Sequence, residues 1–297
     1  MIKVAHSEGV NIYCPKNGKF SFFNSPYFAH RNCASIDIYP NAWFNSVAQS
    51  PVNGEVIGIR EVNRFWHKNF KCSDKDYVLL LRSLENKNKI VKILHLKPTV
   101  KVGDNMHVGE KIGVLIRSGF FDFWTEPHIH VEVRNREDPI RARGGCRIGG
   151  TIKIDDNMDL IDLMSIKGTV VDSKREYSLI APEREFKHGI PVYLDEQIGF
   201  LDGGIPHYGF FGVHTNFTPK IGGQVKFLNE RIGLVTSVFG NMCLATFRNT
   251  MFKLNGKNVR LSLYLFLSKP LLKIVPQRIG ELNLEKFDFV ELTAAST

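Results

Sequence analysis

Polar and apolar residues alternate along residues 126–134, whose sequence is Glu-Pro-His-Ile-His-Val-Glu-Val-Arg. This period of two predicts a β-strand with one buried face, because successive side chains of a strand point to opposite sides. The aliphatic residues would face a core, and the polar face would carry His128, His130 and Glu132. Two imidazoles and a carboxylate on one face suit metal binding or proton transfer. The alternative is a solvated sheet face with surface histidines, since a lone His-x-His motif has a high false-positive rate.

A second alternating stretch, residues 35–39, predicts a strand in which Asp37 is flanked by buried aliphatic residues. His30 and Cys33 lie in the loop that leads into this strand. Each residue has an ordinary explanation when taken alone: the cysteine as a small buried hydrophobe, the histidine as a surface residue, and the aspartate as an acceptor in a turn. Together they place three types of metal ligand within one short segment.

The segments between these two stretches carry the same β pattern. Residues 50–59 combine a tight Asn-Gly turn with a strand, and residues 76–82 and 89–96 predict a hairpin that ends in His95 and a leucine. Between residues 97 and 116, short apolar pieces alternate with glycines, which is typical of a β-barrel or β-sandwich. Helical periodicity is nearly absent, so the sequence predicts an all-β fold.

The glycine-rich and partly acidic stretch after residue 135 predicts a boundary. We expect three parts: a first β domain at residues 1–145, a linker at 146–162, and a second all-β domain at 163–297. The second domain echoes the first, because His214 precedes a proline and several glycines at nearly the spacing found after His95. This echo predicts a degenerate, related barrel. The second domain has no His-x-His motif, and we expect it to be non-catalytic.

Composition limits the partners and the location. The 297 residues allow two ordinary domains, and a 43% hydrophobic content is that of a globular protein. A formal charge of +9 favours polyanions in a general way, but the basic residues form neither a block nor a nucleic-acid module, so nucleic acid is disfavoured as a partner. Five widely spaced cysteines argue against a disulfide framework. No signal peptide or membrane-spanning apolar run is visible, which predicts a cytoplasmic protein.

The order of these segments, over about residues 26–135, resembles the lysostaphin-type zinc metallopeptidases, the peptidoglycan-hydrolase family built on the duplicated hybrid motif. Five features carry the resemblance: the Asp37 strand, the Pro-x-x-Gly-x-Val turn and strand at residues 51–56, the His-Leu pair at His95, the Val-x-Val-Gly and Gly-x-x-Ile-Gly stretch, and the His-x-His-x-Glu-Val strand. The resemblance implies a barrel-sandwich fold for the first domain. It also implies a zinc-dependent endopeptidase that acts on a peptide or a peptidic polymer.

The resemblance further implies a role for five residues: Asp37 and His130 as zinc ligands, His128 as general base, His95 as oxyanion donor, and Glu132 as the carboxylate that orients a ligand. The first zinc ligand departs from the family, whose histidine stands four residues before the aspartate. Here that position is Cys33, and the nearest histidine is His30. Either residue could complete the site, and we favour His30 because an imidazole leaves zinc more Lewis-acidic than a thiolate does.

Two other functions stay open at this point. A site that has lost its first ligand would leave a catalytically inactive, barrel-fold binding module, since a fold does not guarantee an activity. A basic, nucleic-acid-associated β protein is the remaining interpretation. Members of the resembled family usually act on cell-wall peptide outside the cytoplasm, whereas no export signal is visible here. The sequence therefore leaves the substrate undefined.

Overall fold

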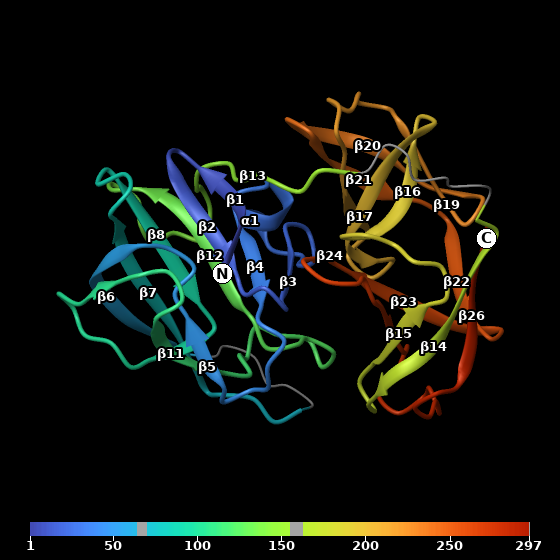
Figure 1. Cartoon of the computed structure of the whole chain (residues 1–297), viewed down its shortest axis with the longest axis horizontal. Helices are drawn as coiled ribbons and strands as arrows, with labels where there is room; N and C mark the ends of the chain where they lie inside the picture. Colours follow the sequence, from blue (N-terminus) through green and yellow to red (C-terminus); the bar gives the residue numbers. More distant parts are fainter. Residues whose placement is uncertain (64–69, 155–162, 297) are drawn as a thin grey trace. The chain divides into compact units, whose positions relative to one another are not determined.

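The computed structural model describes residues 1–63, 70–154 and 163–296 (Figure 1). These residues form strands and loops, and the single-turn helix α1 (Phe28–Arg31) is the one helix among them. The all-β prediction is therefore confirmed. Within the described ranges, no helix has the length and hydrophobicity that a membrane span requires.

Two compact units divide the chain. The first comprises Met1–Phe20 and Tyr27–Thr151, and the second comprises Ser21–Pro26 and Ile152–Thr297. Residues 21–26, which we expected in the first domain, thus group with the second unit. A buried carboxylate explains this grouping, because Asp202 accepts hydrogen bonds from the Ser21 hydroxyl and from the Phe22 N–H (2.7 Å).

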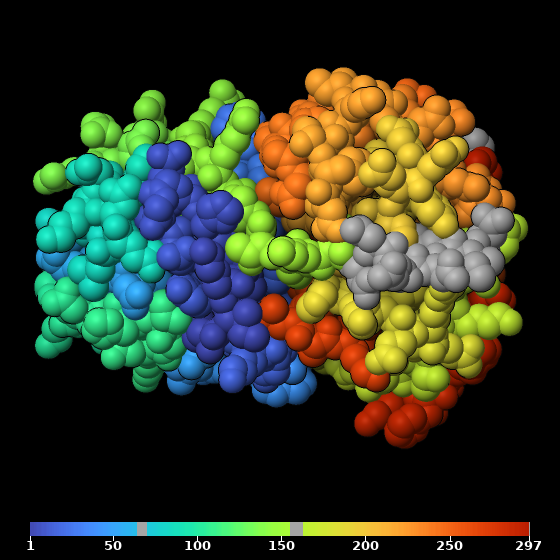
Figure 2. Space-filling model, turned by 45° about the horizontal axis from the view of Figure 1, so that its top comes forward, coloured from blue at the N-terminus to red at the C-terminus, as the bar shows by residue number. Residues whose placement is uncertain are grey.

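The boundary of the first unit lies further along the chain than the sequence predicts. Residues 146–151 were expected in the linker but belong to the first unit, because β13 (Gly149–Gly150) pairs with β1 (Ile2–Ser7). Figure 2 shows the N-terminal residues, in dark blue, at the surface of this unit. Of the remaining expected linker, residues 155–162 lie outside the described residues.

A long sheet forms the body of the first unit (Figure 1). Its strands follow one another in the order β10 (Asn105–Met106), β6 (Gly54–Asn63), β7 (Lys75–Ser83), β8 (Lys89–Leu94), β12 (Ile129–Asn135), β4 (Ile36–Tyr39) and β3 (Lys19–Ser21). Two small sheets complete the unit: β13, β1 and β2 (Val10–Cys14), and β5 (Val47–Gln49), β11 (Lys111–Leu115) and β9 (Leu96–Pro98).

Strand β12 occupies the position that decides the site. It lies between β4 and β8, and His130 pairs in register with Asp37 on one side and Leu94 on the other. The aliphatic residues of β12 are buried, as the alternation predicts. The polar face is buried as well, since His130 is 8% exposed and Glu132 is 2% exposed. The alternative of a solvated sheet face with surface histidines is therefore wrong.

The second unit contains a closed six-stranded β-barrel. The barrel strands follow the order β16 (Ile190–Leu194), β19 (Gln224–Phe227), β20 (Glu230–Phe239), β21 (Met242–Phe247), β18 (Phe210–His214) and β17 (Gln197–Ile205), and β17 pairs back with β16. Closure removes the free strand edges that would otherwise be open to intermolecular pairing.

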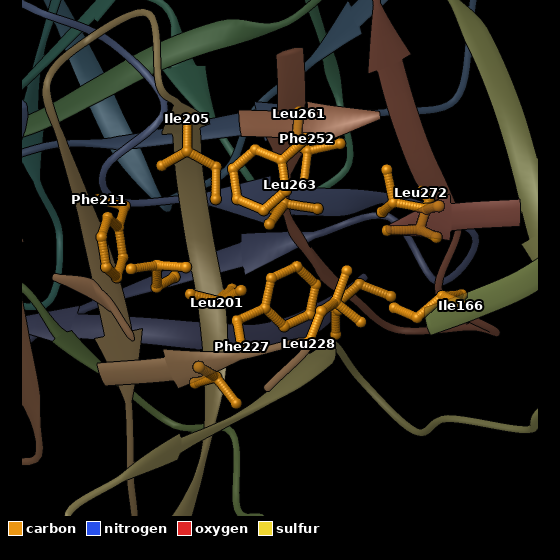
Figure 3. Packing of buried hydrophobic residues seen from close by; sticks show 14 of the residues in the cluster. Ile166, Leu201, Ile205, Phe211, Phe227, Leu228, Phe252, Leu261, Leu263 and Leu272 are labelled. Atoms are coloured by element: carbon orange, nitrogen blue, oxygen red, sulfur yellow. The ribbon is translucent and has the colours of Figure 1, made fainter. Parts of the chain in front are cut away.

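A second ring of strands continues from β17. It is formed by β23 (Lys257–Leu263), β22 (Thr250–Leu254), β26 (Phe289–Ser296), β14 (Ser165–Ser173), β15 (Ser178–Pro182) and β25 (Leu272–Val275), which pairs back with β23. The short β24 (Leu265–Phe266) lies between β23 and β25 in the sequence. Aliphatic and aromatic side chains from both rings pack into one buried cluster, in which Figure 3 labels Leu201, Phe227 and Phe252.

The second unit also holds a buried aspartate–histidine pair. His214 ends β18, and its Nε2 atom lies 3.0 Å from Asp202 Oδ2. This histidine is the residue that echoes His95 in the sequence, although His95 lies one residue beyond the end of β8. Among the described residues, the one group of three metal-ligand side chains lies in the first unit.

A half-buried histidine makes the stability of the second unit sensitive to acid. Burial, together with the charges of Arg260 and Lys273, lowers the pKa of His207 from 6.5 to about 3. The unfolded chain therefore takes up this proton first, so the contribution of His207 is complete above pH 6.5 and falls as the pH drops toward 3. Between pH 7 and pH 4 the loss amounts to about 3 kcal/mol at most.

We expect His207→Phe, which cannot titrate, to flatten this acid dependence. The measurement is urea unfolding, followed by circular dichroism at pH 7 and pH 4 for both proteins. An equal loss of stability in the two proteins would show that His207 is not the responsible group.

Candidate metal centre

His30 reaches the centre through a single helical turn. It lies in α1 and is 1% exposed. The segment from His30 to Asp37 would span ~23 Å if extended, at about 3.3 Å per residue, whereas a helix rises only about 1.5 Å per residue. The turn folds this segment back, and His30 Nε2 lies 3.3 Å from Asp37 Oδ1.

Cys33, the other candidate for the first ligand, is directed elsewhere. Its thiol donates to the carbonyl oxygen of Ile148 at 3.4 Å, and its φ of 53° lies in the left-handed region. The ligand-type side chains that converge are His30, Asp37 and His130. The structure thus brings His30, and not Cys33, to the candidate centre.

The three converging atoms lie close to the spacing that a zinc ion requires. His30 Nε2, His130 Nδ1 and Asp37 Oδ1 form a triangle with edges of 3.1, 2.9 and 3.3 Å. Atoms about 2.0 Å from one tetrahedral zinc ion are separated by ~3.3 Å, so the triangle needs only a small expansion to hold the metal. Two imidazoles and one carboxylate also form a donor set known from catalytic zinc sites, which keep a fourth position open.

Glu132 holds the second nitrogen of His130. Its Oε1 atom lies 3.2 Å from His130 Nε2, which leaves Nδ1 for a metal. Two cations hold the carboxylate in turn, Lys92 Nζ at 2.8 Å and Arg134 Nη1 at 2.6 Å. Burial raises the pKa of Glu132, but the hydrogen bond and charge of His130 and the charge of Lys92 lower it to about 2. Burial lowers the pKa of His130, but its hydrogen bonds to Asp37 and Glu132 raise it to about 9.

The Nε2 atom of His128, which carries no proton in the neutral ring, lies beside the carboxylate of Asp37. Its Nδ1–H donates to the backbone carbonyl of Glu126 at 2.9 Å, because a carbonyl oxygen can only accept. The Nε2 atom is therefore the acceptor of the neutral ring, and it lies 3.5 Å from Asp37 Oδ2. Burial lowers the pKa of His128 to about 4, so the ring is neutral at physiological pH.

His95 is held by a carboxylate that the sequence did not identify. Its Nδ1 atom lies 2.6 Å from Asp76 Oδ2, and its ring centroid lies 5.2 Å from that of His128. Ser118 Oγ donates to the same Asp76 oxygen at 2.5 Å. The signal for Asp76 in the sequence was a carboxylate at the head of an apolar strand, which also fits an ordinary strand end.

The aromatic loop before β12 packs on the histidines. The ring of Phe121 lies 4.7 Å from that of His95 and 4.6 Å from that of His128. Phe120 contacts Tyr27 edge-on at 6.4 Å, and the Tyr27 hydroxyl donates to the Phe120 carbonyl at 3.2 Å. Tyr27 is 51% exposed, so this pair forms part of the surface beside the centre.

One comparison with known proteins matches the part of the chain that carries the candidate centre. The family model described as Domain of unknown function (DUF8155) N-terminal domain matches residues 11–149, a span that includes every side chain of the candidate centre. A search of the curated proteins finds no match. The solution structure of lysostaphin aligns with a TM-score of 0.32 and 14% identity, covering 92% of this chain and 100% of that chain. At this TM-score the alignment leaves the fold to be judged from the chain itself.

Proposed function

We propose that the first unit is a zinc-dependent peptidase that hydrolyses a peptide bond with an activated water. The observation that carries the proposal is the convergence of His30 Nε2, His130 Nδ1 and Asp37 Oδ1, with two further histidines beside them. These three residues would hold the metal. A zinc ion held there supplies a Lewis acid and lowers the pKa of water from 15.7 to about 7.

The two other histidines would have different roles in the reaction. His128 offers the lone pair of Nε2 beside Asp37, so it can accept the proton of the attacking water as a general base. His95 donates from Nδ1 to Asp76, so its Nε2 atom can donate to a developing oxyanion when the ring carries a proton on each nitrogen. Phe121 packs on both rings and limits the access of bulk water to them.

The proposal is tested with the purified full-length protein. We expect about one zinc per chain by elemental analysis, and hydrolysis of pooled fluorogenic peptides that stops on chelation and returns with added zinc. Zinc without any hydrolysis would instead favour the binding-module alternative. A protein that holds no zinc, or whose peptidase activity survives chelation, would contradict the proposal.

Replacing His128 separates catalysis from metal binding. We expect His128→Ala to keep its zinc and to lose about 100-fold or more in kcat, because a positioned general base contributes about 10²–10⁴ to the rate. The matched control is His107→Ala, which changes an exposed histidine of the same unit and should leave both zinc and kcat unaltered. An unchanged kcat in His128→Ala would remove the assigned role.

A further inference from the structure

We propose that Asp76 is a positioning residue of this centre, which fixes the orientation and the tautomer of His95. The inference rests on the proposed function, because it assigns Asp76 a part in the same hydrolysis. Asp76 lies near the start of β7, far in sequence from the ligand strands, and acts only through its hydrogen bonds.

The carboxylate of Asp76 is buried and fully engaged. It is 2% exposed and accepts from His95 Nδ1 (2.6 Å), from the His95 backbone N–H (3.0 Å) and from Ser118 Oγ (2.5 Å). The Tyr77 N–H adds a contact of 2.7 Å. A buried charge is unfavourable unless such donors surround it, so this arrangement holds the carboxylate in one place.

The backbone of His95 has an unfavourable conformation that the hydrogen bonds to Asp76 stabilise. His95 has a φ of 70°, in the left-handed region that residues with a Cβ avoid. Such a conformation persists only where the surroundings over-determine it. Asp76 binds both the backbone N–H and the ring of this residue, so a single carboxylate fixes the strained backbone and the imidazole together.

The hydrogen bond also decides which nitrogen serves the centre. A carboxylate can only accept, so the proton on this side of the ring is on Nδ1, and Nε2 is left for the reacting groups. The ring lies 5.9 Å from that of His130, centroid to centroid, so His95 lies beside the candidate metal centre. An amide at position 76 could donate to Nδ1 instead and would favour the opposite tautomer.

The experiment combines nitrogen NMR of the histidine rings with kinetics on the zinc-loaded full-length protein. The His95 signals are assigned by comparison with His95→Gln. In the wild type we expect the Nδ1–H form, and in Asp76→Asn we expect loss of that form, retained zinc and a kcat lowered about 10- to 100-fold. Ser118→Ala keeps the carboxylate but removes one brace, and should show a smaller shift in the same direction.

The matched control is Asp202→Asn, the same change at the buried aspartate–histidine pair of the second unit. It should alter neither the His95 signals nor kcat. The inference would be overturned by a wild-type His95 with no proton on Nδ1. It would also be overturned by an Asp76→Asn protein with unchanged His95 signals, whether or not the variants are fully stable. A wild type with the expected His95 signals but no hydrolysis would contradict the proposed function and leave the positioning by Asp76 standing.

Discussion

Replacing Asp37 with alanine is expected to abolish stoichiometric zinc binding and to reduce peptide hydrolysis to the level of the chelated protein. Asp37 supplies the carboxylate of the converging group, and its Oδ1 atom lies 2.9 Å from His130 Nδ1. Burial raises the pKa of Asp37, but the charge of His30 and the hydrogen bonds from His130 and His30 hold it well below its usual value, so the group is an anion ready to bind a cation.

The test of this prediction is elemental analysis and calorimetric zinc titration of the variant. Asp104→Ala is the matched control, since it removes an exposed aspartate of the same unit without touching the centre. Circular dichroism shows whether the variant has folded, because two buried histidines lose their anionic partner. One tightly bound zinc per folded Asp37→Ala chain would remove Asp37 from the ligand set.

Replacing Arg134 with methionine is expected to destabilise the protein by about 3–5 kcal/mol, the usual cost of breaking a buried ion pair. The Arg134 side chain is fully buried and donates to Glu132 Oε2 (2.6 Å), Asp138 Oδ2 (2.9 Å), the Asp138 carbonyl (2.9 Å) and the Arg143 carbonyl (2.9 Å). Methionine keeps much of the volume but leaves these acceptors without their donor. Glu132 would retain Lys92 as its cation.

Arg141→Met is the control for this experiment, because Arg141 pairs with the same Asp138 at 2.8 Å while its side chain is 79% exposed. An exposed ion pair contributes about 0–1 kcal/mol, so the two variants should differ clearly in their urea midpoints. We also expect Arg134→Met to weaken zinc binding about 10- to 100-fold through Glu132. Equal midpoints for the two variants would show that Arg134 does not stabilise the unit.

The local sequence pattern was sufficient to predict which candidate site residues share a face when they lie on the same strand. The side chains of His128, His130 and Glu132 share a face because a strand alternates its side chains whatever its neighbours are. The same rule placed Asp37 on its strand. Burial of this polar face could not be predicted locally, because it depends on the strands and loops that cover it.

The choice of the first ligand lay beyond the local pattern. His30 and Cys33 are equally plausible by residue type, and the single turn of α1 decides between them by bringing Nε2 of His30 toward Asp37. Four-residue helices leave almost no periodicity in a sequence. The contact between Asp76 and His95 could not be predicted from the sequence either. It depends on the pairing of β7 with β8 and on the backbone conformation of His95.

The sequence by itself determined the all-β class, the strand faces, and the chemical types of most of the candidate side chains. Those properties follow from hydrophobic alternation and turn residues, which act within a few positions of the chain. Only the tertiary structure decided which side chains converge, that His30 and not Cys33 lies among them, and that Asp76 is hydrogen-bonded to His95. These outcomes depend on strand register and loop conformation, which bring together residues far apart in the sequence and leave little trace in local composition.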